Sequence, residues 1–261
     1  MNHLRRLFAL SLTPVLSIGL SLNVGAQEIT VSAAASLQNA MRDIGTAYQA
    51  AHPGSKVNFN FAASGPLLAQ IAQGAPVDVF ASADAETMDK AQAQSLIKGE
   101  SRVNFAANEL VLVSPLVQPA SLKSLADLKK PAIAHIAVGT PATVPAGRYA
   151  QAALEAQGLW ADLTPKFVFA ENVRQALNYV SRAEAEAGFV YRTDALIDKG
   201  KVRIDLVVPT TKPVVYPIAL VAATKNAAAA ADFVKFVTGA QGQTVLGKFG
   251  FVAAPTTAPA P

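Results

Sequence analysis

The sequence predicts an α/β protein with open, mostly parallel sheets and helices on both faces. Short runs rich in β-branched and aromatic residues alternate with segments in which apolar residues recur at helical spacing. Glycine and proline separate several of these segments, as in the turn His52-Pro53-Gly54. Strands that alternate with helices at this spacing are typical of βαβ units, which place their strands parallel.

The first half of the chain opens with the β-rich run EITVSAA at Glu28–Ala34. Apolar residues at helical spacing predict a helix over Leu37–Ala51. The next elements expected are a strand over Val57–Phe61, a helix over Leu67–Gln73, a strand over Val77–Ala81, a helix over Glu86–Ile97, a strand over Glu109–Ser114 and a short helix over Ser124–Lys129.

The second half continues the alternation. Gly158 closes a helix expected over Gly147–Gln157, because glycine is favoured just beyond a helix end. The other elements expected are strands over Ile136–Val138, Lys166–Phe169, Gly188–Tyr191, Val202–Val208 and Tyr216–Ala222, and helices over Val173–Val180, Ala230–Thr238 and Gln241–Phe249.

The N-terminal 26 residues have the three parts of a secretory signal peptide. Arg5 and Arg6 form a basic region, Leu7–Leu22 an apolar region, and Val24-Gly25-Ala26 a small-residue cleavage site. Proline and glycine interrupt the apolar run, which is shorter than the roughly 20 residues of a membrane-spanning helix. The remainder is therefore expected to be exported to the periplasm as a soluble chain, with a disordered tail at 253–261 rich in Pro, Thr and Ala.

Charge and cysteine content narrow the function classes. The chain has 22 basic and 18 acidic residues, and loss of Arg5 and Arg6 with the signal peptide leaves a net charge of +2. This near balance argues against a nucleic-acid partner. With no cysteine, the exported chain must be stabilised by its hydrophobic core alone.

The strand-to-helix turns are the expected binding positions, because open α/β sheets bind ligands beyond the carboxyl ends of their strands. Four such turns hold Ser36, Ser64, Ala146 and Val173. A helix N-terminus offers unpaired N–H donors and a partial positive charge, and a serine hydroxyl adds a donor. Together these neutral donors suit an anion. Singly, each serine also fits an ordinary helix cap.

The chain resembles the molybdate-binding periplasmic proteins of ABC transporters, from about Ile29 to Val252. The resemblance rests on five segments in a specific order and spacing: AAASLQNAMRDI at Ala33–Ile44, FAASGPLLAQIAQGAPVDVFASAD at Phe61–Asp84, VPAGRYAQAAL at Val144–Leu154, AENVRQAL at Ala170–Leu177 and GFVYRTDA at Gly188–Ala195.

This resemblance implies a site and a ligand. The oxyanion, molybdate or tungstate, is expected to bind the two serine side chains, backbone N–H groups and a tyrosine hydroxyl. These positions are Ser36, Ser64, Ala146, Val173 and Tyr191. No cofactor and no direct cation site are expected. The expected partners are the oxyanion and a membrane ABC transporter permease, and the protein is expected to be a monomer.

The resemblance also implies a two-domain fold of the type II periplasmic binding proteins, with two crossover strands between the domains. The first domain is expected over 27–106 plus 217–252, and the second over 107–216. The crossings are expected near Phe105–Asn108 and near Tyr216–Pro217. Closure of the two domains on the ligand would then give the shape that a transporter recognises.

Some residues near the motifs need a separate interpretation. The family often has Gly-Asp-Pro where this chain has Gly139-Thr140-Pro141. The resemblance therefore does not define the conformation of the loop before Ala146. Asp78 and Asp84 are interpreted as caps or turn residues, because carboxylates repel an oxyanion. Arg148 is interpreted as a solvated helix residue.

Other function classes fit the sequence less well. The mature chain has only His52 and His135 and lacks a Gly-x-Ser-x-Gly motif, a cysteine nucleophile and metal-type His/Cys spacing, which argues against an enzyme. Ferric-ion binding proteins share the fold class but need clustered tyrosines, and the tyrosines here are scattered. A binding protein for sulfate or phosphate stays open, since the sequence does not give the size of the binding shell.

Overall fold

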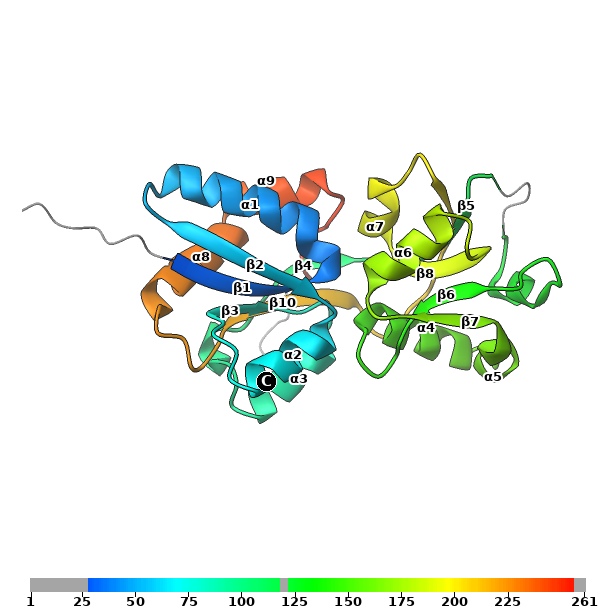
Figure 1. Cartoon of the computed structure of the whole chain (residues 1–261), viewed down its shortest axis with the longest axis horizontal. Helices are drawn as coiled ribbons and strands as arrows, with labels where there is room; N and C mark the ends of the chain where they lie inside the picture. The colour runs from blue at the N-terminus through cyan, green and yellow to red at the C-terminus, as the bar shows by residue number, and fades with distance from the viewer. Residues whose placement is uncertain (1–27, 118–121, 256–261) are drawn as a thin grey trace, which may run out of the picture.

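The computed structural model describes residues 28–117 and 122–255. Two lobes lie side by side, each built on one sheet with helices on both faces (Figure 1). The first lobe is built on the sheet β2-β1-β3-β10-β4 and the second on the sheet β7-β6-β8-β5-β9. The α/β fold with two sheets, expected from the sequence, is confirmed. The expected signal peptide at 1–26 and residues 256–261 of the expected tail lie outside the described residues.

The first lobe combines the two ends of the chain. Its strands are β1 (Glu28–Ala34), β2 (Lys56–Ala62), β3 (Val79–Ala81), β4 (Val103–Asn108) and β10 (Val214–Leu220). One face is covered by α1 (Gln38–Ala51), α8 (Ala227–Thr238) and α9 (Ala240–Lys248), and the other by α2 (Ser64–Ala72) and α3 (Ala85–Ala93) (Figure 1). A 3-10 turn, Gly99–Ser101, precedes β4.

The second lobe comes from the middle of the chain. Its strands are β5 (Leu110–Pro115), β6 (Ile136–Gly139), β7 (Phe167–Ala170), β8 (Ala187–Tyr191) and β9 (Val202–Val207). Its helices are α4 (Pro145–Glu155), α5 (Trp160–Leu163), α6 (Val173–Ser181) and α7 (Arg192–Ile197), and 3-10 turns occur at Leu125–Lys129 and Thr164–Lys166. Helices α6 and α7 lie on the opposite face of this sheet from α4 and α5 (Figure 1).

Four of the five strands in each sheet run in the same direction, so the mostly parallel sheets expected from the sequence are confirmed. Strands β2, β1 and β3 run parallel, as do β7, β6 and β8. One strand of each sheet is reversed: β10 pairs antiparallel with β3 and β4, and β5 pairs antiparallel with β8 and β9. Each reversed strand directly follows a connection between the lobes.

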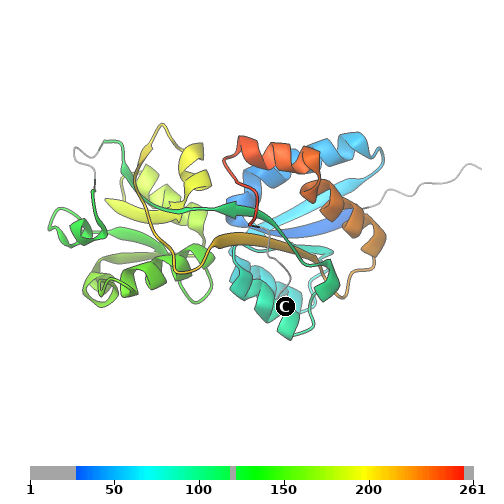
Figure 2. The same cartoon turned by 180° about the vertical axis from the view of Figure 1, so that it is seen from behind.

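The chain passes between the sheets at two places, and both passages are visible in Figure 2. The first is between Asn108, the end of β4, and Leu110, the start of β5. The second is the segment 208–213 between β9 and β10. Ala107 and Val214–Tyr216 thus pair in the first sheet, although the domain boundaries expected from the sequence place them in the second domain.

Helix α1 illustrates why the sequence folds this way. Its buried residues Ala40, Met41, Ile44 and Tyr48 repeat at three- and four-residue spacing and face the sheet. Strand β1, covered by helices on both faces, is buried along nearly its whole length. The result is a rigid sheet in each lobe, whose strand ends fix the helix starts that follow.

Candidate oxyanion-binding site

A small cavity lies between the lobes, at the strand ends that the sequence indicated. It is lined by Ala34, Ala35, Ser36, Ala63, Ser64 and Ala83 from the first lobe and by Val144, Pro145, Ala146, Val173 and Tyr191 from the second. The cavity is small, and all five residues predicted from the sequence line it.

The two serines do not cap the helices that follow them. Ser36 lies inside the 3-10 turn Ala35–Leu37, and the N-cap of α1 is Leu37. Ser64 is the first residue of α2, whose N-cap is Ala63. The Ser64 hydroxyl oxygen instead accepts the Ala83 N–H at 3.0 Å. The Ser64 hydroxyl thus keeps its proton for a further acceptor. Because the N-caps are other residues, the helix-cap interpretation of the two serines is wrong.

Backbone donors come from the starts of two helices in the second lobe. Pro145 occupies the first position of α4, which leaves Ala146 as the first residue there with an N–H. Val173 is the first residue of α6, whose N-cap Asn172 accepts the N–H groups of the two residues after Val173. N–H groups in a first helical turn have no intrahelical acceptor. Those of Ala146 and Val173 are therefore available to a ligand.

Tyr191 ends β8 with its side chain fully buried, and its hydroxyl donates to the Ala83 carbonyl across the cavity at 3.3 Å. Burial raises the pKa of this hydroxyl well above its usual value, because the phenolate would lose its hydration. Tyr191 therefore stays protonated and neutral at physiological pH. Its hydroxyl belongs to the second lobe and donates to a backbone carbonyl of the first.

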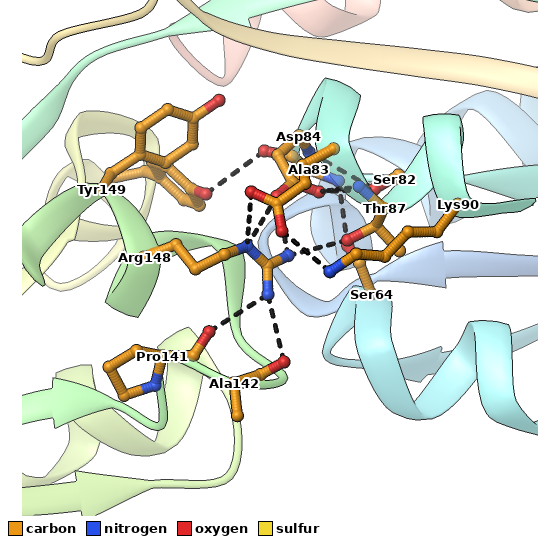
Figure 3. A network of polar contacts seen from close by, with 12 residues as sticks. Ser64, Ser82, Ala83, Asp84, Thr87, Lys90, Pro141, Ala142, Arg148 and Tyr149 are labelled. Carbon is orange, nitrogen blue, oxygen red and sulfur yellow. Dashed lines mark hydrogen bonds and ion pairs between the residues drawn. The ribbon is translucent and has the colours of Figure 1, made fainter. Parts of the chain in front are cut away.

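Two arginines join the lobes beside the cavity. Arg148 of α4 forms an ion pair with Asp84 at 2.7 Å and donates to Thr87 at 2.7 Å. Figure 3 shows its guanidinium between these residues and the carbonyl groups of Pro141 and Ala142. Its side chain is only 17% exposed. The interpretation of Arg148 as a solvated residue is thus wrong, whereas Asp84 does cap α3, as expected.

Arg174 makes the second connection. It pairs with the fully buried Asp194 of its own lobe and donates to Asn39 Oδ1 at 2.9 Å and the Ser36 carbonyl at 3.1 Å in the first lobe. Burial raises the pKa of Asp194, and the Arg174 charge opposes that rise. Each arginine has its own carboxylate partner. The charged side chains next to the cavity are therefore balanced, and the donors that line it are neutral.

The backbones of the two lobes are in direct contact at Gly65. Its N–H donates to the Thr143 carbonyl at 3.0 Å, and a Cβ at Gly65 would lie 2.6 Å from that oxygen. The loop that carries Thr143 begins with Gly139-Thr140-Pro141, where the chain departs from the family pattern. Thr140 is fixed through its N–H and hydroxyl, which both donate to the Ala170 carbonyl. The departure leaves Ala146 at the cavity.

Comparison with known proteins shows the family of the chain. The family model of bacterial extracellular solute-binding proteins matches residues 29–252. The molybdate-binding protein ModA of Escherichia coli strain K12 is 40% identical over 230 residues, which cover 86% of this chain and 88% of that protein. The chain belongs to the bacterial extracellular solute-binding protein family.

Two further members of the solute-binding family are similar over most of their length. A putative ABC transporter substrate-binding lipoprotein, YvgL, of Bacillus subtilis strain 168 is 36% identical over 227 residues, 86% of each chain. The solved structure of the periplasmic molybdate-binding protein of Azotobacter vinelandii superposes with a TM-score of 0.76 at 25% identity, covering 87% of this chain and 100% of that one. The two-lobed fold is thus that of solute-binding proteins.

Several residues at the site escaped the sequence analysis. Arg174 and Asp194 lie inside the motifs AENVRQAL and GFVYRTDA, one residue after Val173 and three after Tyr191, and their opposite charges are the only signal for the pair. Ala83 contributes only backbone atoms, which no sequence pattern marks. Tyr216 gave no signal beyond its place in an expected strand.

Within residues 28–117 and 122–255, His, Cys, Asp and Glu side chains form no group of three or more that would hold a metal ion. In the same part of the chain, none of the helices has the length and apolar character needed to cross a membrane.

Proposed function

We propose that this solute-binding protein captures molybdate in the cavity between its lobes and delivers it to a membrane ABC transporter permease. Tungstate, which has nearly the same size and charge, is expected to bind as well. The observation that carries the proposal is that neutral hydrogen-bond donors from both lobes line one small cavity. The molybdate-binding relatives support the choice of oxyanion.

The proposed ligand groups are the hydroxyls of Ser36, Ser64 and Tyr191 and the N–H groups of Ala146 and Val173. A hydrogen bond to a charged group contributes roughly 1.5–3 kcal/mol. Six or seven such bonds, once backbone N–H groups beside the serines are included, give roughly 10–20 kcal/mol before the desolvation cost of the dianion. A net affinity in the micromolar to nanomolar range, about −8 to −12 kcal/mol, follows.

The donor set also supports selectivity for fully deprotonated oxyanions. A protonated anion such as hydrogen phosphate brings a donor of its own, and the proposed ligand groups offer it no acceptor. Sulfate carries the same charge as molybdate and differs in size, so it is the nearest competitor. No described contact favours sulfate over molybdate.

The proposed cycle uses closure of two domains. Because Ser36 and Ser64 come from one lobe and Ala146, Val173 and Tyr191 from the other, the oxyanion stabilises the closed arrangement preferentially. We infer that the lobes are the two domains, that the N-terminal segment directs export to the periplasm, and that the closed monomer is the form that the permease recognises.

Calorimetric titration of the purified, ligand-free mature chain tests the proposal. Molybdate and tungstate should bind tightly with one-to-one stoichiometry, while sulfate and phosphate give no heat of binding. Tight binding of sulfate or phosphate instead would retain an oxyanion site and contradict molybdate as its ligand. Absence of binding by all four anions would contradict an oxyanion-binding function.

A further inference from the structure

The hydroxyl of Tyr216 contacts Ser36, which lines the cavity, and Tyr216 itself is not a lining residue. Its oxygen is 3.1 Å from Ser36 Oγ, and the Tyr216 side chain is fully buried. The rings of Tyr191 and Phe251 pack edge-on against it with centroids 5.7 Å and 5.3 Å away. Tyr216 does not line the cavity, so it reaches a ligand only through Ser36.

Asn108 fixes the direction of the hydrogen bonds in this chain of polar groups. Its Oδ1 accepts the Glu109 N–H at 2.9 Å, and a backbone N–H only donates, so this atom must be the oxygen. The amide nitrogen therefore faces Thr193 Oγ1 at 2.9 Å and the Tyr216 hydroxyl at 3.2 Å. Its two protons serve these two acceptors.

The order of donors then follows from the chemistry of each group. An amide nitrogen has no acceptor capacity, so the Tyr216 oxygen accepts from Asn108 and its single proton goes to Ser36 Oγ. Burial raises the pKa of Tyr216 well above its usual value, which keeps that proton in place. Because Ser36 Oγ accepts from Tyr216, the Ser36 proton is free to point into the cavity.

Ser64 has the same arrangement with a different donor. Its oxygen accepts the backbone N–H of Ala83, which cannot reverse its direction. At Ser36 the corresponding donor is a hydroxyl, which rotates unless Asn108 holds it. The direction of the Ser36 hydroxyl therefore depends on Asn108 and Tyr216, at the two connections between the lobes.

We propose that Tyr216, oriented by Asn108, is a positioning residue that directs the Ser36 proton into the cavity and so excludes protonated oxyanions. The proposal rests on the proposed function and assigns a specificity role to two residues outside the cavity. Ser36 then presents a donor to a bound anion. Without Tyr216 the Ser36 hydroxyl rotates freely and can accept a hydrogen bond from hydrogen phosphate.

Tyr216→Phe tests the proposal by removing the donor and keeping the ring. Molybdate affinity should fall roughly 5- to 30-fold, as expected for one lost orienting hydrogen bond. Phosphate, which is expected to give no heat of binding with the wild type, should become a measurable ligand of the variant. A purely structural role would weaken molybdate binding without admitting phosphate, so a variant that still binds no phosphate overturns the proposal. Tyr48→Phe is the matched control, because its buried hydroxyl donates to Asp232 on α8, and neither quantity should change.

Asn108→Asp tests the direction of these hydrogen bonds with almost no change in side-chain shape. A carboxylate only accepts, so the Tyr216 proton should turn toward it, and Ser36 must then donate to Tyr216 instead of to the ligand. Molybdate affinity should fall at least as far as in Tyr216→Phe. Asn108→Ala removes the amide without reversing the direction of the hydrogen bonds, so it should lose less molybdate affinity.

A double-mutant cycle distinguishes an effect that passes through Tyr216 to Ser36, the relay, from simple repulsion of the anion by the new carboxylate. If the effect passes through Tyr216, Asn108→Asp should cost at least fivefold less affinity in the Tyr216→Phe background than in the wild type. Equal losses in both backgrounds would overturn the relay. If the wild type binds no oxyanion, the proposed function fails; if it binds molybdate and these variants match it, only this inference fails.

Discussion

Ser36 and Ser64 show that a shift of one residue relative to a helix start changes the role of a side chain. From the sequence, each fitted both a helix cap and an anion donor. In the structure Ser64 is one residue beyond the N-cap and Ser36 lies within a 3-10 turn, so neither hydroxyl serves its own helix. The family resemblance implies both residues as ligand groups, and both line the cavity. Local pattern alone does not identify them, because a one-residue shift of a helix start is not encoded in composition.

Serine removal should weaken binding with little effect on folding. Ser36→Ala or Ser64→Ala should each reduce molybdate affinity by about 1–3 kcal/mol, roughly 5- to 150-fold, because a charge-assisted hydrogen bond is lost. Calorimetry measures the affinity. Ser181→Ala is the control, since that hydroxyl donates to Asn178 O at an exposed position. Unchanged affinity in both site variants would contradict the assignment.

Tyr191→Phe should weaken binding less than the serine variants and chiefly loosen closure. The lost hydroxyl has a single proton, which it donates to the Ala83 carbonyl of the opposite lobe and must turn toward the oxyanion to bind it. Calorimetry gives the affinity, and small-angle X-ray scattering with molybdate gives the compactness. A variant with both values at wild-type level would remove Tyr191 from the site.

The buried tyrosines also determine the expected pH dependence. The pKa values of Tyr191 and Tyr216 are raised above the ordinary value of 10.0, first by burial. A raised pKa keeps the phenol protonated to higher pH, so both donors should persist beyond the point where an exposed tyrosine ionises. Molybdate affinity measured from pH 7 to pH 10 should stay constant. A loss of affinity centred near pH 10 would show that these hydroxyls are not buried as described.

At the scale of elements, the turns that follow strands are what the sequence predicted best, and the reversed direction of β5 and β10 is what it did not indicate. Turns after β1, β2, β6 and β7 bring their residues to one cavity, as expected for strand ends in an α/β fold. Strands β5 and β10 pair antiparallel because they adjoin the passages between lobes. Their direction depends on that long-range path, which alternation of strands and helices does not reveal.

The contact of α2 with the loop before α4 gives a prediction for Gly65. Gly65→Ala should place a methyl group against the Thr143 carbonyl when the lobes close. Overpacking of this kind costs typically about 1–3 kcal/mol, so molybdate affinity should fall roughly 5- to 150-fold. Gly247→Ala, in the open surface of α9, should leave affinity unchanged. Wild-type affinity in Gly65→Ala would show that the closed state does not need this approach.

At the scale of the whole molecule, the cross-lobe ion pair lay beyond sequence reasoning. Arg148 and Asp84 are 64 residues apart and come from different lobes. Read singly, Arg148 appears as a polar residue on a helix, and only the relative placement of the lobes buries it. The two-lobed arrangement itself was predictable from the family resemblance. The residues that form the ion pair between the lobes were not predictable.

Arg148→Gln should favour the open arrangement, because it leaves Asp84 without its partner only when the lobes are closed. Loss of one partner from a buried pair is strongly destabilising, and we expect molybdate affinity to fall about 10- to 100-fold. Small-angle X-ray scattering with saturating molybdate should still show the compact form. Arg192→Gln, which breaks an exposed pair with Glu109, is the control and should bind normally. Equal affinity in the two variants would contradict a closing role for Arg148.

The most direct test of the account is a crystal structure of the protein grown with molybdate, with diffraction measured at the molybdenum absorption edge. The account predicts one anomalous peak in the cavity between the lobes. The anion's oxygens should lie within hydrogen-bond distance of the hydroxyls of Ser36, Ser64 and Tyr191 and the N–H groups of Ala146 and Val173. A peak elsewhere, or an anion held by one lobe alone, would contradict it.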